Sequence, residues 1–248
     1  MVIFLLYIFV VKKIFMIEVR KLYKRFGNKT VLRGLDFQVA QGEFVALLGP
    51  NGAGKTTFLR ILASLSRPTL GEVRIAGLGL PHQAAAVRRR LGVVSHLPLL
   101  YGDLTAEENL RFYGRMYAVE ALERRIGEVL ALVGLETRRR DLLRTFSRGM
   151  QQRLAIGRAV LHDPQVLLLD EPYTGLDQQA CEMLDGVLRQ VIGLSRTVVM
   201  TSHDLLRAAD LAGRFDVLSH GTIQASVRKA DLPPDGLLAF YREAVNDG

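Results

Sequence analysis

From Met16 to about Leu80 the chain alternates between short β-prone runs and glycine-rich breaks. Four runs are rich in apolar, β-branched or aromatic residues and are bounded by glycine or polar residues, which is typical of strands. They are Ile17–Leu22, Val31–Val39, Glu43–Leu48 and Glu72–Ile75. One helix is predicted among them, because apolar residues from Phe58 to Leu65 recur at helical spacing until Pro68 ends the pattern.

The middle of the chain, from about Val87 to Leu161, has a helical pattern instead. Thr105 is followed three residues later by Glu108, which is the arrangement of a capping box at a helix start. A second helix is predicted over Leu122–Leu132, because its apolar positions repeat at helical spacing before Gly134. These helices are expected to form a lobe inserted into a β-rich core.

After Pro164 the β pattern returns. Val166–Leu169 and Thr197–Met200 are continuous apolar runs, as expected for strands buried on both faces of a parallel sheet. A helical stretch, Gln178–Ile192, lies between them, and this alternation indicates a parallel α/β core. A further short strand is predicted after Gly221, and a last helix over Leu237–Val245.

Composition narrows the class of protein. The 248 residues are 49% hydrophobic and 23% charged, which suits a globular domain. The formal charge of +8 comes largely from short arginine clusters, which we interpret as solvated helix faces; attraction to a membrane surface is the alternative. Aromatic residues do not interleave with these clusters, so no nucleic-acid partner is expected. The single cysteine, Cys181, excludes an internal disulfide.

The N-terminus is unusually apolar from Val2 to Val11. Ten residues are too few to span a bilayer, and the positive charges follow the run rather than precede it, unlike a secretory signal. We therefore interpret residues 1–15 as an extension that reflects an upstream or mis-set start; a peripheral membrane anchor is the alternative. The expected organisation is this extension, a nucleotide-binding domain over 16–225 with its helical subdomain at about 87–161, and a C-terminal helical tail over 226–248.

A phosphate-binding loop follows the strand that ends at Leu48. The pattern G-x-x-x-x-G-K-[ST] directly after a strand and before a helix is specific for such loops. Its glycines allow backbone N–H groups to converge on phosphates, the lysine reaches the β and γ oxygens, and the hydroxyl completes a Mg²⁺ shell. The residues expected to bind nucleotide here are Gly49, Pro50, Asn51, Gly52, Ala53, Gly54, Lys55, Thr56 and Thr57.

Two carboxylates end the apolar strand at residue 169. Asp170 is predicted to hold Mg²⁺ together with Thr56, and Glu171 is predicted to act as the general base for an attacking water. A strand ending in Asp-Glu is only a moderate signal alone. Its coexistence with the phosphate loop predicts an ATPase that uses ATP and Mg²⁺.

A second phosphate-binding site, which we call a phosphate seat, is indicated at Phe146–Arg153. Ser147 and Gly149 open a long helical run, and a helix N-terminus carries N–H groups and partial positive charge that favour an anion. Since the phosphate loop already holds the chain's own nucleotide, we expect this seat to serve the γ-phosphate of a neighbour. The prediction is a dimer with ATP between the subunits.

With these motifs in this order, the chain resembles the ATP-binding subunits of ABC transporters from Met16 to about Ala225. The resemblance implies a P-loop α/β fold with a mostly parallel core sheet, an N-terminal antiparallel β subdomain and an inserted α-helical subdomain. It implies that Thr174–Asp177 is the D-loop, with Asp177 near the nucleotide, and that His203 is the switch histidine. Phe26 matches the aromatic residue that stacks on adenine; a core aromatic is the alternative.

The resemblance also implies partners and place. We expect a homodimer or pseudo-symmetric dimer of ATPase subunits, bound peripherally to an integral membrane permease on the cytoplasmic face of the cell membrane. Two alternatives to this main prediction of a transporter ATPase are kept open. One is the ATPase of an exporter of the multidrug type, and the other is a non-transport ABC ATPase that acts in DNA repair, translation or Fe–S assembly.

Two departures from the usual family pattern suggest a subfamily. His96 stands where most members have glutamine in the loop that joins the core to the helical lobe. Phe146–Met150, which the resemblance identifies as the family's signature segment, reads Phe-Ser-Arg-Gly-Met rather than Leu-Ser-Gly-Gly-Gln. Together with the stretches Asp103–Tyr113 and Asp170–Asp177, these features resemble the ATPase of the haem exporter of cytochrome c biogenesis. His96 is expected to act in catalysis by bonding a Mg²⁺-bound water or the γ-phosphate; packing at the lobe joint is the alternative. Because histidine titrates near neutrality, turnover should fall more steeply below about pH 6.5 than in a His96→Gln variant.

Overall fold

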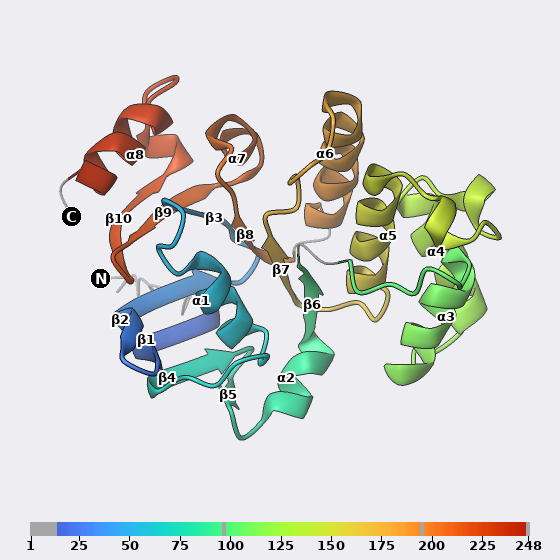
Figure 1. The fold of residues 1–248 in the computed structure, drawn as a ribbon, viewed down its shortest axis with the longest axis horizontal. Coiled ribbons are helices and arrows are strands. Elements are labelled where there is room, and N and C mark those ends of the chain that lie inside the picture. The colour runs from blue at the N-terminus through green and yellow to red at the C-terminus, as the bar shows by residue number, and fades with distance from the viewer. Residues whose placement is uncertain (1–13, 96–97, 194–195, 247–248) are drawn as a thin grey trace, which may run out of the picture.

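Two β-sheets and eight α-helices make up the part of the chain that the computed structural model describes, which is residues 14–95, 98–193 and 196–246. Figure 1 shows the smaller sheet next to α1 on one side of the molecule and α3, α4 and α5 on the other, with the main sheet between them. The observed architecture is the P-loop α/β fold predicted from sequence.

The main sheet has six strands. Five are parallel, and the edge strand β10 is antiparallel to β9. In spatial order the strands are β10 (Thr222–Arg228), β9 (Arg214–Ser219), β3 (Phe44–Leu48), β8 (Thr197–Thr201), β7 (Val166–Asp170) and β6 (Leu91–Val94). β3, β7 and β8 are buried along their whole length, as their continuous apolar runs predict.

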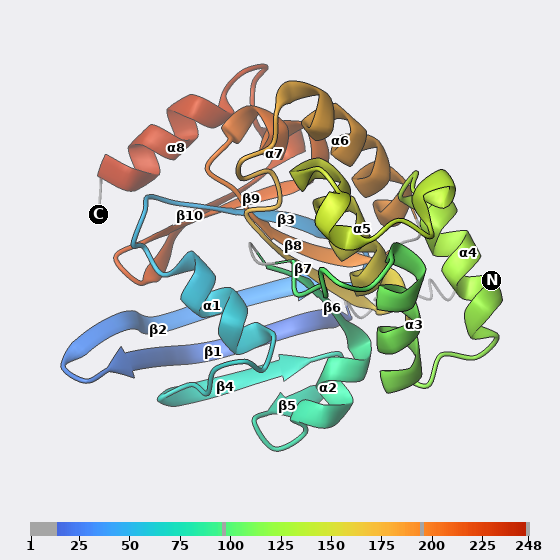
Figure 2. The ribbon, with the colours of Figure 1, turned by 45° about the vertical axis from the view of Figure 1, so that its right-hand side comes forward.

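The smaller sheet is antiparallel throughout. Its strands, in spatial order, are β2 (Lys29–Ala40), β1 (Phe15–Phe26), β4 (Leu70–Ile75) and β5 (Leu78–Leu80). Figure 2 shows β1, β2 and β4 as a layer beneath α1, with the main sheet above α1 in the same view.

The helices cover both faces of the main sheet. They are α1 (Lys55–Leu62), α2 (Ala84–Arg90), α3 (Ala106–Met116), α4 (Leu122–Leu132), α5 (Arg148–Val160), α6 (Gln178–Ile192), α7 (Leu205–Leu211) and α8 (Leu237–Asn246). Single 3₁₀ turns lie at Glu136–Arg138, Leu143–Thr145 and Lys229–Asp231. The predicted capping box is present, since Thr105 Oγ1 accepts from the Glu108 N–H and the Glu108 carboxylate accepts from the Thr105 N–H.

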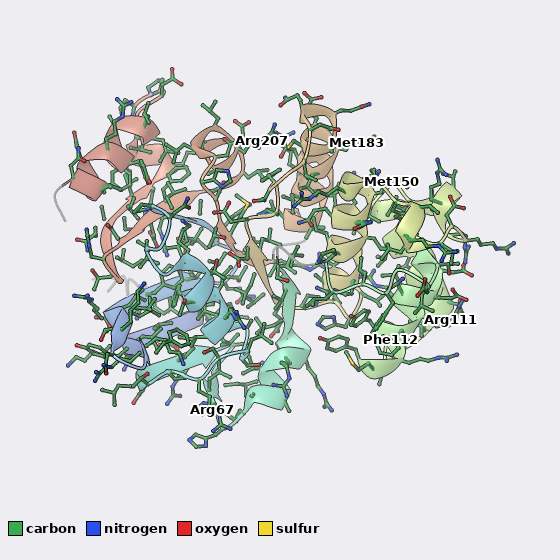
Figure 3. The ribbon with its side chains drawn as sticks, viewed as in Figure 1. Arg67, Arg111, Phe112, Met150, Met183 and Arg207 are labelled. Carbon is green, nitrogen blue, oxygen red and sulfur yellow. The ribbon has the colours of Figure 1, made fainter. Side chains whose placement is uncertain are left out.

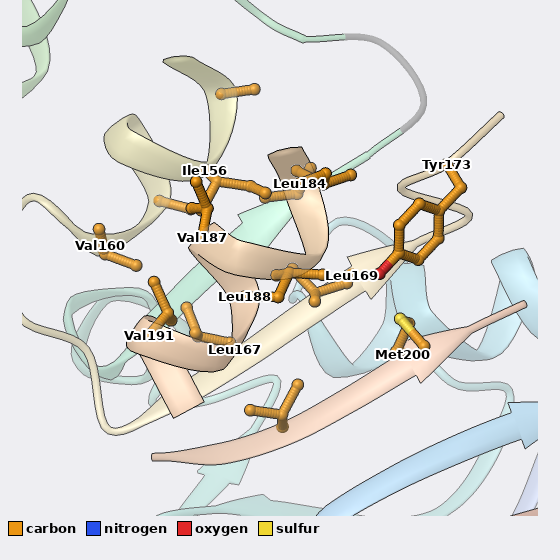
Figure 4. Close-up of a cluster of buried hydrophobic side chains, with 14 of the residues drawn as sticks. Ile156, Val160, Leu167, Leu169, Tyr173, Leu184, Val187, Leu188, Val191 and Met200 are labelled. Carbon is orange, nitrogen blue, oxygen red and sulfur yellow. The ribbon is translucent and has the colours of Figure 1, made fainter. Parts of the chain in front are cut away.

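Two hydrophobic cores lie on opposite faces of the main sheet, because successive strand side chains point to opposite sides. In β3, Val45 and Leu47 pack with α1 and the smaller sheet, whereas Ala46 and Leu48 pack with the core beneath α5 and α6. Figure 4 shows part of the second core, with side chains of α6 against those of β7 and α5. The functional loops leave the sheet between these two cores.

Three strands were not predicted. β6 lies inside the stretch 87–161 that was expected to be mostly helical, and it pairs in parallel with β7 at the edge of the main sheet. It has only four residues, which is too short for a periodic signal. β9 was missed because Asp216 interrupts its apolar pattern, although this side chain is buried and bonded to Arg214. β5 has three residues and only intermediate burial.

Within the described residues, no helix is both long enough and apolar enough to cross a bilayer. The apolar run Val2–Val11 lies outside the described residues, and so does His96.

Candidate functional site

The phosphate loop lies at the carboxyl end of β3 and leads into α1. Gly54 begins α1 in a left-handed conformation with φ of 111°. Lys55 Nζ donates to the carbonyl oxygens of Gly49 and Pro50, at 2.7 and 3.2 Å. The lysine side chain therefore crosses the loop that it closes. Burial lowers the pKa of Lys55, and the charges of Glu171 and Asp170 oppose that shift.

Gly49 shows why the loop needs glycine. Its φ is 149°, and a Cβ at this position would lie 2.1 Å from the carbonyl oxygen of Leu218 in β9. No side chain can be accommodated at such a distance from a backbone oxygen. The first residue of the loop is thus fixed by close packing against the neighbouring strand.

Asp170 and Thr56 meet at the end of β7. Thr56 Oγ1 donates to Asp170 Oδ1 at 3.2 Å, and Thr201 Oγ1 donates to the same oxygen at 2.8 Å. These are hard oxygen donors, which suit Mg²⁺. No group of three or more His, Cys, Asp or Glu that could hold a metal occurs among the described residues.

Glu171 and His203 form a close pair. His203 Nδ1 lies 2.6 Å from Glu171 Oε2, and the Glu171 N–H donates to Thr201 Oγ1 at 2.9 Å. Glu171 has a φ of 50°, a left-handed conformation that is uncommon for a residue with a Cβ. Its carboxylate is 21% exposed and the His203 ring 65% exposed. The pair therefore reaches solvent at the mouth of the site.

One cavity of about 910 Å³ joins the phosphate loop to this pair. Asn51, Gly52, Lys55, Thr56, Glu171 and His203 line it, as the sequence analysis implies. Thr174, from the predicted D-loop, also lines it. Other lining residues were not singled out as site residues from sequence. These are Lys29, Thr30, Val31 and Arg33 of β2, Ser219, His220 and Gly221 at the turn from β9 to β10, and Val245 of α8. They reach the cavity through the packing of β2 against β10 and of α8 against β9, for which no local sequence signal exists.

Phe26 is not among the described residues that line this cavity. It ends β1, is 54% exposed, and has Lys24 Nζ 4.6 Å from its ring centroid. The four β2 residues that do line the cavity begin three positions later. Phe26 is accessible for stacking, and the adenine contact stays a prediction.

The second predicted phosphate seat lies apart from this cavity. Ser147 caps α5 by accepting from the Met150 N–H at 3.3 Å, and its side chain is exposed. Neither Ser147 nor Gly149 is among the described residues that line the cavity. Figure 1 shows the start of α5 separated from α1 by the strands of the main sheet.

Arg148, whose role the sequence left open, lies against the loop Thr174–Asp177. A Cβ at Gly175 would fall 2.3 Å from Arg148 Nη1, so the guanidinium occupies the space that a larger residue there would need. In the same loop Asp177 caps α6, with its side chain accepting from the Ala180 N–H at 2.7 Å. The starts of α5 and α6 are thus packed together.

Comparison with known proteins gives the family. A family model described as ABC transporter matches residues 32–174, more than half of the chain. The Nod factor export ATP-binding protein I of Paraburkholderia xenovorans (strain LB400) is 40% identical over 207 residues, covering 83% of this chain and 68% of that protein. The linearmycin resistance ATP-binding protein LnrL of Bacillus subtilis (strain 168) is 36% identical over 219 residues, covering 88% and 70%.

Solved structures agree with this result. An ATP-binding subunit of an ABC transporter has a TM-score of 0.83 at 30% identity and covers 92% of this chain and 99% of that one. A dimeric ATP-binding cassette, MJ0796, in a post-hydrolysis state with ADP and Pi has a TM-score of 0.78 at 28% identity, covering 86% and 99%. The phosphate loop and Glu171 line one cavity, and Asp170 is bonded to Thr56 beside it. Together with this geometry, these matches show that the chain belongs to the ABC transporter family, as an ATP-binding subunit.

Proposed function

We propose that this subunit hydrolyses ATP, with Glu171 as the general base and His203 as the residue that orients it. The observation that carries the proposal is the 2.6 Å contact between their side chains at the edge of the cavity that Lys55 also lines. A carboxylate held by an imidazole can accept a proton from a water placed in line with the γ-phosphate.

The remaining groups of the cavity fit phosphate. Lys55 would move its ammonium from the Gly49 carbonyl to the β and γ oxygens, where its charge offsets the charge of the transition state. The backbone N–H groups at the start of α1 favour the same oxygens. Thr56 and Asp170 would hold Mg²⁺, which neutralises phosphate charge when it is bound.

A direct test measures steady-state ATP hydrolysis by the wild-type chain and a Glu171→Gln variant. The isosteric amide keeps a bond to His203 but cannot accept a proton, so kcat should fall by about 100-fold or more. ATP should still bind, and a dimer with trapped ATP should accumulate on gel filtration with light scattering. A Glu171→Gln protein with the wild-type rate would remove the general-base assignment.

The chain is proposed to act as a homodimer or pseudo-symmetric dimer. Ser147 and Gly149 lie at an exposed helix start outside the chain's own cavity, which supports a role toward a nucleotide held by a second subunit. The similarity to a dimeric cassette bound to ADP and Pi supports the same arrangement.

An integral membrane permease is the proposed partner, with this subunit attached peripherally at the cytoplasmic face. A groove of about 190 Å³ beside β6 suits such a partner. Leu65, Leu99 and Tyr113 line it, Arg88 and Arg158 add positive charge, and exposed Tyr101 and Phe112 lie next to Tyr113. Figure 3 shows Phe112 at this side of α3. A cytoplasmic helix with apolar and acidic residues is the occupant that this chemistry favours.

The cargo is proposed to be exported. Two relatives are named for Nod factor export and linearmycin resistance, and they favour an exporter of a compound other than haem. An exporter of another cargo was one of the alternatives that the sequence left open. The haem prediction rests on His96, Arg148 and Met150 together with Asp103–Tyr113 and Asp170–Asp177, whereas the relatives reported above are named for other cargoes. Identification of the membrane subunit that copurifies with the chain from detergent-solubilised membranes, with a stain for bound haem, decides between the two.

A further inference from the structure

A cluster of polar side chains lies outside the nucleotide cavity, between α6 and α7. Arg207 of α7 donates through Nη1 to Asp185 Oδ2 and through Nη2 to Gln178 Oε1, each at 2.9 Å. Its Nε lies 3.4 Å from Asp204 Oδ2. The arginine side chain is only 16% exposed. Figure 3 labels Arg207 where α7 faces α6.

Tyr173 completes the cluster from the end of β7. Its hydroxyl donates to the other oxygen of Asp185, Oδ1, at 2.5 Å. The Arg207 guanidinium carbon lies 5.3 Å from its ring centroid, within range of a cation–π contact. Burial, followed by the bond to Asp185, raises the pKa of Tyr173, so the phenol stays a donor at neutral pH. Figure 4 shows the Tyr173 ring at the end of β7.

This cluster joins the two loops that carry the Glu171–His203 pair. Tyr173 follows Glu171 by two residues, and Arg207 follows His203 by four. Between His203 and Arg207, Asp204 caps α7 by accepting from the Arg207 N–H at 3.1 Å. The His203 ring is itself 65% exposed, so its own packing does little to hold it. Its loop is held instead through Asp204 and Arg207.

A second cavity, of about 330 Å³, lies between the cluster and the pair. Glu171, Tyr173, His203, Asp204 and Arg207 are among the residues that line it. Glu171, Thr174 and His203 also line the nucleotide cavity, so the pair stands between the two spaces. On the side away from the nucleotide cavity the pair therefore borders this second cavity, next to the loops that the cluster anchors.

We propose that Arg207 is a positioning residue for ATP hydrolysis: by tying α7 to Asp185, Gln178 and Tyr173 it holds His203 in register with Glu171. The inference rests on the proposed ATPase function. It assigns Arg207 no contact with ATP. Its removal lets His203 drift from Glu171, and misplacement of a catalytic group by about 1 Å can lower a rate by up to about 100-fold.

The matched control is Arg214. It is another nearly buried arginine, 15% exposed, with ion pairs to Glu43 at 2.7 Å and Asp216 at 3.0 Å. It is not among the residues described as lining either cavity. Arg207→Met and Arg214→Met thus remove a similar ionic network, one near the pair and one away from it.

The experiment measures thermal melting, kcat and the KM for ATP in both variants. We expect both to lose stability, but only Arg207→Met to lose kcat, by about tenfold, with KM changed by less than about threefold. In a His203→Ala background, Arg207→Met should lower the residual kcat by less than about twofold, because the positioned group is already absent.

Two results would overturn the inference while hydrolysis by the wild type stands. One is a kcat of Arg207→Met equal to that of Arg214→Met. The other is an undiminished effect of Arg207→Met in the His203→Ala background. Absence of ATP hydrolysis by the wild-type protein would instead remove the proposed function itself.

Discussion

Two helices of this subunit begin at predicted phosphate seats, and their surroundings differ. α1 starts inside the large cavity, where Lys55 is buried and bonded to the loop that precedes it. α5 starts at the surface, where Ser147 and Arg148 are exposed. Of the two predicted seats, one thus lies inside a cavity of the chain and the other is open to the outside.

This difference separates two tasks, binding of ATP by one subunit and association of two subunits, which the sequence motifs alone do not distinguish. Residues around α1 should determine how tightly a single subunit binds ATP. Residues around the start of α5 should determine how two subunits associate once ATP is bound. Substitutions at the two seats therefore test the comparison directly.

Lys55→Met should have the largest effect. Loss of charged hydrogen bonds to phosphate, worth about 1.5–3 kcal/mol, should weaken ATP binding to the isolated subunit by about 10- to 100-fold. Isothermal titration with ATP measures the change. Ser147→Ala is the control and should leave this affinity unaltered; an equal loss in both variants would contradict the division of tasks.

Ser147→Ala should act on the dimer instead. In a Glu171→Gln background with ATP, the dimer dissociation constant should rise about tenfold, as expected for one lost bond to a charged group. Sedimentation velocity at several protein concentrations measures it.

Thr105→Ala is the matched control, because Thr105 is also a side-chain N-cap, at the start of α3. Both variants should lose about 1 kcal/mol of stability through the lost cap. Only Ser147→Ala should weaken the dimer. If Thr105→Ala weakens it equally, the effect comes from stability and not from phosphate contact.

Gly175→Ala should give a smaller effect through Arg148. Its φ of 72° is unfavourable for alanine, and the new Cβ would displace the Arg148 guanidinium. We expect turnover to fall by about threefold, and the double variant with Arg148→Ala to recover part of it, with a coupling of about 0.5–1 kcal/mol. Strictly additive rate changes would show that Arg148 does not act through this loop.

His162, just beyond the buried end of α5, should give the smallest effect. Its ring stacks on Tyr117 with centroids 3.9 Å apart, and Nε2 bonds the Leu91 carbonyl. Burial lowers the pKa of His162 below its ordinary value of about 6.5, although the bond to the Leu91 carbonyl and the charge of Asp163 oppose the shift. Below about pH 6.5 the unfolded chain therefore binds a proton that the folded chain does not. The folded state should accordingly lose stability as the pH is lowered.

Denaturant titrations between pH 7.5 and 5.5 measure this dependence. A His162→Phe variant, which keeps the stack on Tyr117, should lose less stability over that window than the wild type. The exposed His82, replaced by Phe, is the control and should leave the slope unchanged. Identical slopes for all three proteins would remove His162 as the cause.

The local signals of the chain predicted the parts of the fold that depend on local chemistry. The phosphate loop, the Thr105 cap and the fully buried strands β7 and β8, each built around an apolar run, follow from spacing and polarity over a few residues. β9 could not be predicted this way, because its Asp216 is stabilised by Arg214 and by Ser226 of the neighbouring strand. That compensation exists only after the strands have paired.

The same reasoning divides the candidate site. Lys55, Thr56, Asp170 and Glu171 belong to motifs that sequence reveals. The β2 and α8 residues of the cavity, and the position of Arg207, depend on contacts between segments far apart in the chain. Arg148 is intermediate: the sequence marked it as unusual, and the structure places it against Gly175.

The left-handed backbone at Glu171 has a consequence for engineering. A residue with a Cβ in this conformation is less stable by about 1 kcal/mol or more than glycine would be. Selection for heat tolerance alone would therefore favour glycine at this position and discard the carboxylate that faces His203. A thermostability screen of this subunit should hold residue 171 constant, because the most durable variants that it returns could be those that no longer turn over ATP.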